Sequence, residues 1–217
     1  NHRVEAYKNT KLKKALSYAI DRQKIVEFVL KGGQKAADGF IPPSPAFPSA
    51  AYPLFRPEEA KRLFAEAGYS ANNPPPDLTI LYNSSDSHKM LAEVINQMWL
   101  QTLGVKAELV NMEWKVYLDR TSSGNYQSLA RASWIGDYAD PNTFLELFIT
   151  GNGNNRSGYS DRGFDSLVNK ANSTSEPKKR LQILRQAENR LLDSAAMIPI
   201  YFYSLNELRR PGIQGAI

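Results

Sequence analysis

Apolar residues recur at helical spacing over the first third of the chain. The first pattern carries Leu12, Ala15, Leu16 and Ala19 on one face and follows Thr10, whose hydroxyl we expect to cap the helix. Asp21 begins a second pattern, which ends at Gly32-Gly33. Prolines then crowd residues 38–57, which predicts an extended ordered loop rather than a helix or strand.

Strand and helix patterns alternate over the rest of the chain. Strands are predicted at 78–82, 106–111, 127–134 and 197–203, and helices at 57–68, 87–103, 114–121, 164–171 and 177–193. The last strand is apolar throughout and is expected to be buried, as is Trp99 inside the longest helix. Strands that alternate with helices of this length are typical of βαβ units. The sequence predicts one α/β domain with a mixed, mainly parallel sheet flanked by helices.

The segment 131–145, RASWIGDYADPNTFL, joins a predicted strand to a predicted helix. Asp140-Pro141 is typical of a helix start, because Asp accepts hydrogen bonds from free N–H groups and Pro fits the first helical position. Asp137 has no such structural role. It follows Trp134-Ile135 and the flexible Gly136, where a carboxylate beside an aromatic wall is suited to an ammonium group. We interpret Asp137 as a cation-binding residue, with acid–base chemistry shared with Asp140 as the alternative.

Other side chains near strand ends are candidates for the same region. Arg131 alternates with Ser133, Ile135 and Asp137 on one strand face, and an arginine there needs an anion, water or a structural salt bridge. His88 is expected to be a cap or a surface residue at a helix start. Aromatic residues near strand ends supply either pocket walls or core. They are Tyr82, Trp114, Tyr117, Trp134 and Tyr138.

Composition excludes several classes of chemistry. The chain has no cysteine and only two histidines, so neither thiolate catalysis nor a Cys/His metal site is expected. The Gly/Asn loop at 151–155 lacks the Lys-Ser/Thr of a phosphate-binding loop. The net charge of +5 is spread along the chain, which argues against nucleic-acid binding. No apolar run reaches the ~18 residues of a membrane span. We expect a binding protein without a cofactor rather than an enzyme.

Several motifs occur in order over nearly the whole chain. They are KLKKALSYAIDRQKIVEFVLKGGQKAADGFIPP (11–43), EEAKRLFAEAGY (58–69), LTILYNSSDSHKMLAEVINQMWLQTLGVKAELVNMEWKVYLD (78–119), RASWIGDYADPNTFL (131–145), FDSLVNKAN (164–172) and MIPIYFY (197–203). In these motifs the chain resembles the extracytoplasmic solute-binding proteins of ABC peptide importers, specifically the oligopeptide-binding group. The resemblance implies a protein of two lobes that close around the ligand.

The resemblance assigns residues 1–217 to the C-terminal lobe, a fragment without the N-terminal lobe and the final return segment. The abrupt start at Asn1-His2-Arg3 also indicates a piece of a longer protein, whose full length would carry a signal peptide. Because closure of both lobes buries the ligand, we expect the chain alone to bind peptide weakly.

The resemblance also implies roles for single residues. The aspartate that matches Asp137 pairs with the free α-amino group of a bound peptide, and backbone near Ser133 and Ile135 adds the peptide as a further strand. The positions that match pocket walls are Trp114 and Trp134. The positions near peptide side chains or the C-terminal carboxylate match Asn83, His88 and Arg131.

Two positions depart from the family pattern. Where the family has a lysine that can meet the carboxylate of a short peptide, this chain has Leu30, with Lys31 next to it. Where the family has a pocket arginine, this chain has Thr121, with Arg120 next to it. Either the sequence register or the preferred peptide length differs at these positions.

The resemblance implies an oligopeptide ligand and ABC-transporter membrane permease subunits as partners. It places the protein in the periplasm, or lipid-anchored at the outer face of the cytoplasmic membrane, and we expect a monomer. Dipeptides, murein peptides, nickel chelates and sugars are alternative ligands within the family, of which Asp137 favours those with a free amine. A hydrolase of small amines that uses Asp137 and Asp140, and a receptor that reads peptides without importing them, are further alternatives.

Overall fold

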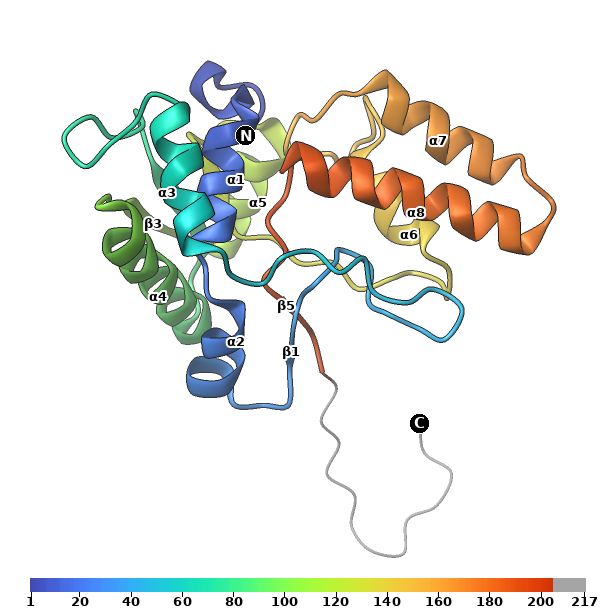
Figure 1. Ribbon diagram of the computed structural model, residues 1–217, viewed down its shortest axis with the longest axis horizontal. Coiled ribbons are helices and arrows are strands. Elements are labelled where there is room, and N and C mark those ends of the chain that lie inside the picture. Colours follow the sequence, from blue (N-terminus) through green and yellow to red (C-terminus); the bar gives the residue numbers. More distant parts are fainter. Residues whose placement is uncertain (205–217) are drawn as a thin grey trace, which may run out of the picture.

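The computed structural model describes residues 1–204, so 205–217 of the predicted domain lie outside the described residues. In chain order the elements are η1 (Glu5–Lys8), α1 (Thr10–Tyr18), α2 (Arg22–Lys24), η2 (Ile25–Leu30), β1 (Lys35–Ala36), α3 (Pro57–Glu66), β2 (Thr79–Asn83), α4 (Asp86–Leu103), β3 (Glu108–Met112), α5 (Trp114–Ser123), β4 (Leu129–Ala130), α6 (Asn142–Leu145), η3 (Glu146–Phe148), α7 (Arg162–Asn172), α8 (Pro177–Ser194) and β5 (Tyr201–Phe202). Helices α1, α3 and α4 lie at one side of the molecule and α6, α7 and α8 at the other (Figure 1). The predicted α/β fold is confirmed.

The central sheet has three parallel strands in the order β3-β2-β4. Leu81 of β2 pairs with Val110 on one side and with Ala130 on the other. Every residue of β2 is buried, and α4 and α5 supply the crossovers that parallel neighbours require. Helix α4 ends where Gly104 takes a φ of 73°, a left-handed conformation that glycine adopts without strain.

The first hydrophobic cluster lies between this sheet and helices α1, α3 and α4. Trp99 of α4 is 1% exposed, and its indole N–H donates to the carbonyl of Leu16 in α1 at 2.8 Å. The prediction that Trp99 belongs to the core is therefore confirmed. The hydrogen bond satisfies the one polar atom that this large side chain buries.

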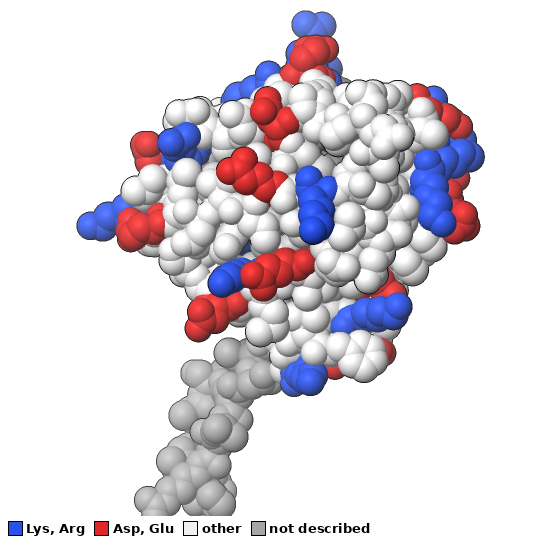
Figure 2. All heavy atoms as spheres, turned by 90° about the vertical axis from the view of Figure 1, so that its left-hand side faces the viewer, with Lys and Arg blue, Asp and Glu red and all other residues white. Residues whose placement is uncertain are grey.

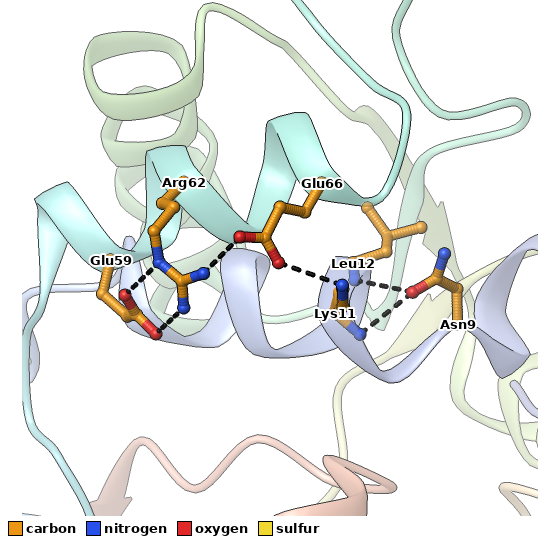
Figure 3. A network of polar contacts seen from close by, with 6 residues as sticks. All are labelled: Asn9, Lys11, Leu12, Glu59, Arg62 and Glu66. Carbon is orange, nitrogen blue, oxygen red and sulfur yellow. Dashed lines mark hydrogen bonds and ion pairs between the residues drawn. The ribbon is translucent and has the colours of Figure 1, made fainter.

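A chain of surface contacts also joins α3 to α1 (Figure 3). Arg62 lies between Glu59 and Glu66 on α3 and forms an ion pair with each. Glu66 pairs in turn with Lys11 of α1 at 3.0 Å. All four side chains are more than a third exposed, so the network adds little to stability compared with the apolar contacts beneath it.

The helix ends correct two predictions and confirm a third. Asn9, not Thr10, caps α1, because the Asn9 side-chain oxygen accepts from the N–H groups of Lys11 and Leu12 (Figure 3). Asp21 caps α2 as predicted and accepts from the N–H of Lys24 at 3.1 Å. The chain then continues as the π-helix η2, which ends at Lys31 with a φ of 53°. The helix thus stops one residue before the predicted glycine pair.

Arg22 is a buried cation that no acid of residues 1–204 neutralises. Its guanidinium donates to the carbonyls of Pro199 (2.5 Å), Leu54 (2.8 Å), Ser17 (3.1 Å) and Ile20 (3.2 Å), and to the Ser17 hydroxyl. Burial lowers the pKa of Arg22 to about 10, so the side chain stays charged at neutral pH. It fixes the segment that enters β5 against the end of α1.

The second hydrophobic cluster packs α6, α7 and α8 against part of the proline-rich loop. As predicted, residues 38–56 form neither helix nor strand. A buried carboxylate orders the loop: Glu188 accepts from the N–H groups of Phe40 and Ile41 at 2.9 and 3.0 Å, and from Arg185. Arg185 also lies over the ring of Phe47, 3.9 Å from its centroid.

Two strands are shorter than predicted. Strand β4 covers only Leu129–Ala130, because it lies at the sheet edge and its contact with β2 ends where the Arg131 N–H meets the Leu81 carbonyl. Strand β5 covers only Tyr201–Phe202 and pairs antiparallel with β1, which the sequence did not predict. The expectation that 197–203 is a buried strand is wrong, since this apolar run bridges the two clusters: Met197 packs on the second, and residues 198, 200 and 201 pack on the first.

Candidate ligand-binding site

An open stretch of backbone leaves the sheet after β4. Arg131 still belongs to the sheet, because its N–H donates to Leu81 at 2.8 Å and its carbonyl accepts from the Tyr117 hydroxyl. Within the described part of the chain, no N–H group of residues 132–136 has a hydrogen-bond partner. Ser133 and Ile135 lie in this stretch rather than in a strand, and Ile135 is 79% exposed. Unpaired donors at a sheet edge can pair with an extended main chain from outside.

Asp137 ends this open stretch with an exposed carboxylate. Its own N–H donates to Thr143 Oγ1 at 3.1 Å, which fixes the turn. Gly136 lets the backbone approach Thr143, since a Cβ there would lie 3.0 Å from the Thr143 methyl carbon. None of the cations of residues 1–204 forms an ion pair with Asp137. Its carboxylate is available to an ammonium group from outside.

Asp140 is already occupied by internal contacts. It accepts from the N–H of Asn142 at 2.8 Å and forms a bidentate pair with Arg180 at 2.5 and 2.9 Å. Burial alone would raise the pKa of Asp140, but the bonds from Arg180 and the Asn142 N–H outweigh it and leave that pKa lowered. Asp140 thus accepts from a free N–H at the helix start, as predicted, but Pro141 holds the capping position before α6 and not the first helical position that was predicted for it. These contacts argue against a shared catalytic role with Asp137.

Arg131, His88 and Asn83 come together from three elements. Burial lowers the pKa of His88, the charge of Arg131 lowers it further, and the backbone of Asn83 opposes both. Arg131 donates to the Tyr203 hydroxyl, and no carboxylate of residues 1–204 pairs with it. Within residues 1–204, the alternative of a structural salt bridge therefore has no support. His88 is the third residue of α4, where Ser85 holds the capping position, so His88 is not the cap.

Three predicted site residues carry buried polar atoms without partners. They are Asn83 Oδ1, His88 Nδ1 and Trp134 Nε1, out of five such atoms in the described part of the chain. A buried polar group without a partner costs about 1–3 kcal/mol. A ligand that supplies complementary groups would remove that cost, so these atoms make the region a candidate binding site.

Some of the predicted aromatic residues lie in the hydrophobic core, and others keep part of their rings exposed. Tyr82 and Tyr117 are buried, so the core interpretation is confirmed for both. Trp114 is 49% exposed and stacks on Tyr117 with 5.7 Å between the ring centroids. Trp134 is half-buried, and Tyr138 is exposed. Trp114 and Trp134 are the two aromatic surfaces that an incoming ligand can contact.

Two supporting residues were missed by the sequence interpretation. Tyr203 holds Arg131, and Thr143 holds Asp137. Tyr203 has no local signal, because it lies 72 residues from Arg131, whereas Thr143 lies only six residues from Asp137 in the segment 131–145. At one of the two positions that depart from the family pattern, Thr121 is buried and donates to the Tyr117 carbonyl at 2.9 Å, while its neighbour Arg120 is exposed. Thr121 thus has an internal role.

The rest of the described chain offers little competing chemistry. Residues 1–204 contain no group of three or more His, Asp or Glu side chains that could hold a metal ion. None of the helices within this range combines the length and apolar character needed to cross a membrane. On the face that carries α3 and α4, acidic and basic side chains are interspersed, and no large patch of one sign covers its described part (Figure 2). Such a surface lacks the electrostatic footprint of nucleic-acid binding.

Comparisons with known proteins agree with this geometry. Residues 1–156 match the family model of bacterial extracellular solute-binding proteins, family 5 Middle. The dipeptide-binding protein DppE of Bacillus subtilis is 34% identical over 226 residues, covering 100% of this chain and 41% of the relative. The solved structure of the murein tripeptide-binding protein MppA of Escherichia coli has a TM-score of 0.88 at 34% identity, covering 94% of this chain and 41% of that one.

A third relative was solved with a peptide. The structure of Haemophilus influenzae OppA in complex with RPPGFSPFR has a TM-score of 0.85 at 30% identity, covering 94% of this chain and 41% of that one. The chain thus spans about two fifths of the length of the curated relatives it matches. Sequence and fold agree over nearly all of it, and the chain belongs to the bacterial extracellular solute-binding proteins of family 5.

Proposed function

We propose that this chain is the peptide-gripping, C-terminal lobe of the solute receptor of an ABC importer. Asp137 binds the α-amino group of the peptide, and the open backbone at Ser133 and Ile135 pairs with the peptide main chain. The observation that carries the proposal is the run of N–H groups at 132–136, which have no partner among residues 1–204 and lead to an exposed carboxylate that has no ion pair in the same range. Main-chain pairing is independent of side chains, whereas the carboxylate selects a free amine.

The other predicted site residues supply further contacts to the same peptide. The unpaired atoms of Asn83, His88 and Trp134 supply polar contacts, and Trp114 supplies an aromatic wall. Arg131, which pairs with no carboxylate of the described residues, suits the C-terminal carboxylate of the peptide or an acidic side chain. The names of the relatives support a peptide ligand, since they refer to a dipeptide, a murein tripeptide and a nonapeptide.

The wider setting follows from the family. A second lobe closes over the ligand, and permease subunits in the membrane receive it. The protein works in the periplasm or lipid-anchored at the outer face of the cytoplasmic membrane, as a monomer. Dipeptides and murein peptides satisfy Asp137 equally well, whereas sugars and nickel chelates do not use its carboxylate in this way. A hydrolase is disfavoured because Asp140 is held by Arg180.

Calorimetry on the full-length protein tests the proposal. We expect Asp137→Ala to weaken binding of an unmodified peptide at least about 100-fold, or about 2.8 kcal/mol, and N-acetylation of the peptide to weaken wild-type binding similarly. Asp193→Ala is the matched control, because Asp193 is an exposed acid at the end of α8 whose only ion pair is with Lys14. Equal affinity for free and acetylated peptides would refute the role of Asp137. Product formation from the peptide would instead favour the hydrolase.

A further inference from the structure

A small neutral cavity lies beside His88 and Tyr203. Its volume is about 300 Å³, and it is lined by Val29, Leu30, Gln34, Ser87, His88, Met90, Tyr201 and Tyr203. This volume is at the lower limit for ligand sites, so the cavity suits one side chain rather than a whole peptide. Among residues 1–204, the lining contains no Asp, Glu, Lys or Arg. Burial and the charge of Arg131 lower the pKa of His88, so this side chain is also neutral at pH 7.

The apolar wall of the cavity depends on the π-helix η2. In a π-helix the hydrogen bonds run from i to i+5, which changes the rotation of the residues that follow. Here Val29 and Leu30 face the cavity, while Lys31 takes a left-handed φ of 53°, is exposed and is not part of the lining. A cation is thereby kept away from the cavity, although it is the next residue in the chain. π-helical turns occur frequently at functional sites.

The opposite wall is aromatic and connects the cavity to the ligand site. Tyr201 and Tyr203 meet edge to face with 5.3 Å between the ring centroids. The Tyr203 hydroxyl accepts a hydrogen bond from Arg131, which has no carboxylate partner in residues 1–204. The described walls of the cavity are therefore neutral, and a cation without a carboxylate partner in residues 1–204 lies at its rim.

We infer that this cavity binds the side chain of the peptide's C-terminal residue, that it selects an apolar side chain such as leucine, and that it rejects an acidic one. The inference rests on the proposed peptide-binding function. A peptide carboxylate at Arg131 complements the rim charge and brings the last side chain to the neutral walls. With Arg131 occupied by the peptide carboxylate, a glutamate side chain would lose its hydration there without gaining a cation, since Lys31 lies outside the described lining. Leu30 and Met90 are then specificity-determining residues.

Binding of peptides with a varied last residue tests the inference. The probes are unblocked peptides of two to four alanines followed by Leu, Ala or Glu, titrated into the full-length protein by calorimetry. At the length that binds best, we expect the Leu peptide to bind about tenfold more tightly than the Ala peptide, or about 1.4 kcal/mol, and the Glu peptide to bind more weakly than both. A wild type that binds all three equally overturns the inference and leaves the proposed function intact. No binding by any peptide overturns both.

Met90→Lys tests the wall directly. Met90 is 48% exposed on α4, so the substitution places a cation at the cavity without disturbing the core. We expect the Leu preference to fall below about threefold and the Glu peptide to gain at least about tenfold. Val116→Lys is the matched control, since Val116 is 49% exposed on α5 and lies outside the lining. An unchanged preference in Met90→Lys, or an equal change in Val116→Lys, contradicts the inference.

Discussion

Replacement of Arg22 with alanine should destabilise the fold strongly. The guanidinium is buried and is the only donor in residues 1–204 that reaches the carbonyls of Leu54 and Pro199. Its loss leaves both carbonyls without a partner, and each buried orphan costs about 1–3 kcal/mol. We therefore expect a loss of about 4 kcal/mol in the free energy of unfolding. That is a large fraction of the roughly 5–15 kcal/mol by which domains are stable.

Thermal unfolding provides the measurement. For a chain of this length, 1 kcal/mol changes Tm by about 2–4 °C, so Arg22→Ala should lower Tm by about 8–16 °C. Arg22→Lys should lose about half as much, because an ammonium group has three donors and cannot reach all the acceptors of the planar guanidinium. Arg62→Ala is the control, since Arg62 is exposed and pairs only with Glu59 and Glu66.

Two outcomes would refute this reasoning. A Tm for Arg22→Ala within about 2 °C of the wild type would show that water or other donors satisfy the carbonyls. Equal losses for Arg22→Lys and Arg22→Ala would show that the loss does not depend on how many donors remain. Circular dichroism of each variant at low temperature establishes that it is folded before the Tm values are compared.

Three further substitutions test other buried contacts. Burial raises the pKa of Glu188 above its usual 4.5. The stability that Glu188 contributes to the fold is therefore complete below pH 4.5 and is lost as pH rises through the pKa of the folded state. In urea unfolding, the free energy of unfolding of the wild type minus that of Glu188→Gln should therefore fall as pH rises above 4.5, and a difference that does not change with pH contradicts this sign. The pKa of Asp140 is lowered below 3.8, so its stabilisation is present above that value. Asp140→Asn should cost about 1–2 kcal/mol at pH 7 and progressively less below about pH 4, whereas a constant cost argues against the Arg180 pair. Trp99→Phe should cost about 1–2 kcal/mol in guanidinium unfolding, because the Leu16 carbonyl loses its donor, and no loss would assign Trp99 to packing alone.

Features that depend on neighbouring residues were predicted well. Pro57 begins α3, Asp21 caps α2 and Gly104 ends α4, because caps and glycine stops act within one or two turns. Asp137 and Asp140 were separated correctly for the same reason, since a helix start is visible in the Asp-Pro pair. The other contact of Asp140, its ion pair with Arg180 40 residues away, is not indicated by the sequence.

Features that depend on distant residues were missed. Arg22 meets Pro199 across 177 residues, Glu188 meets Phe40 across 148, and Arg131 meets Tyr203 across 72. Hydrophobic periodicity does not indicate these contacts, because Arg22, Glu188 and Arg131 are polar residues that a sequence pattern would assign to the surface. The strands predicted at 127–134 and 197–203 are too long for a different reason. Their composition favours strands, but a strand needs a hydrogen-bonded neighbour, and only short parts of each run have one.

The open backbone at 132–136 has a second consequence, which concerns association of the protein with itself. A sheet edge with unpaired N–H groups is a template for any extended chain, including the same segment of another copy. Here the open stretch is only five residues long, and a charged Asp137 and then Pro141 follow it. Charge and proline are among the features by which proteins protect exposed edges from aggregation. The carboxylate that we propose to select a peptide's amine therefore also discourages self-pairing while the site is empty.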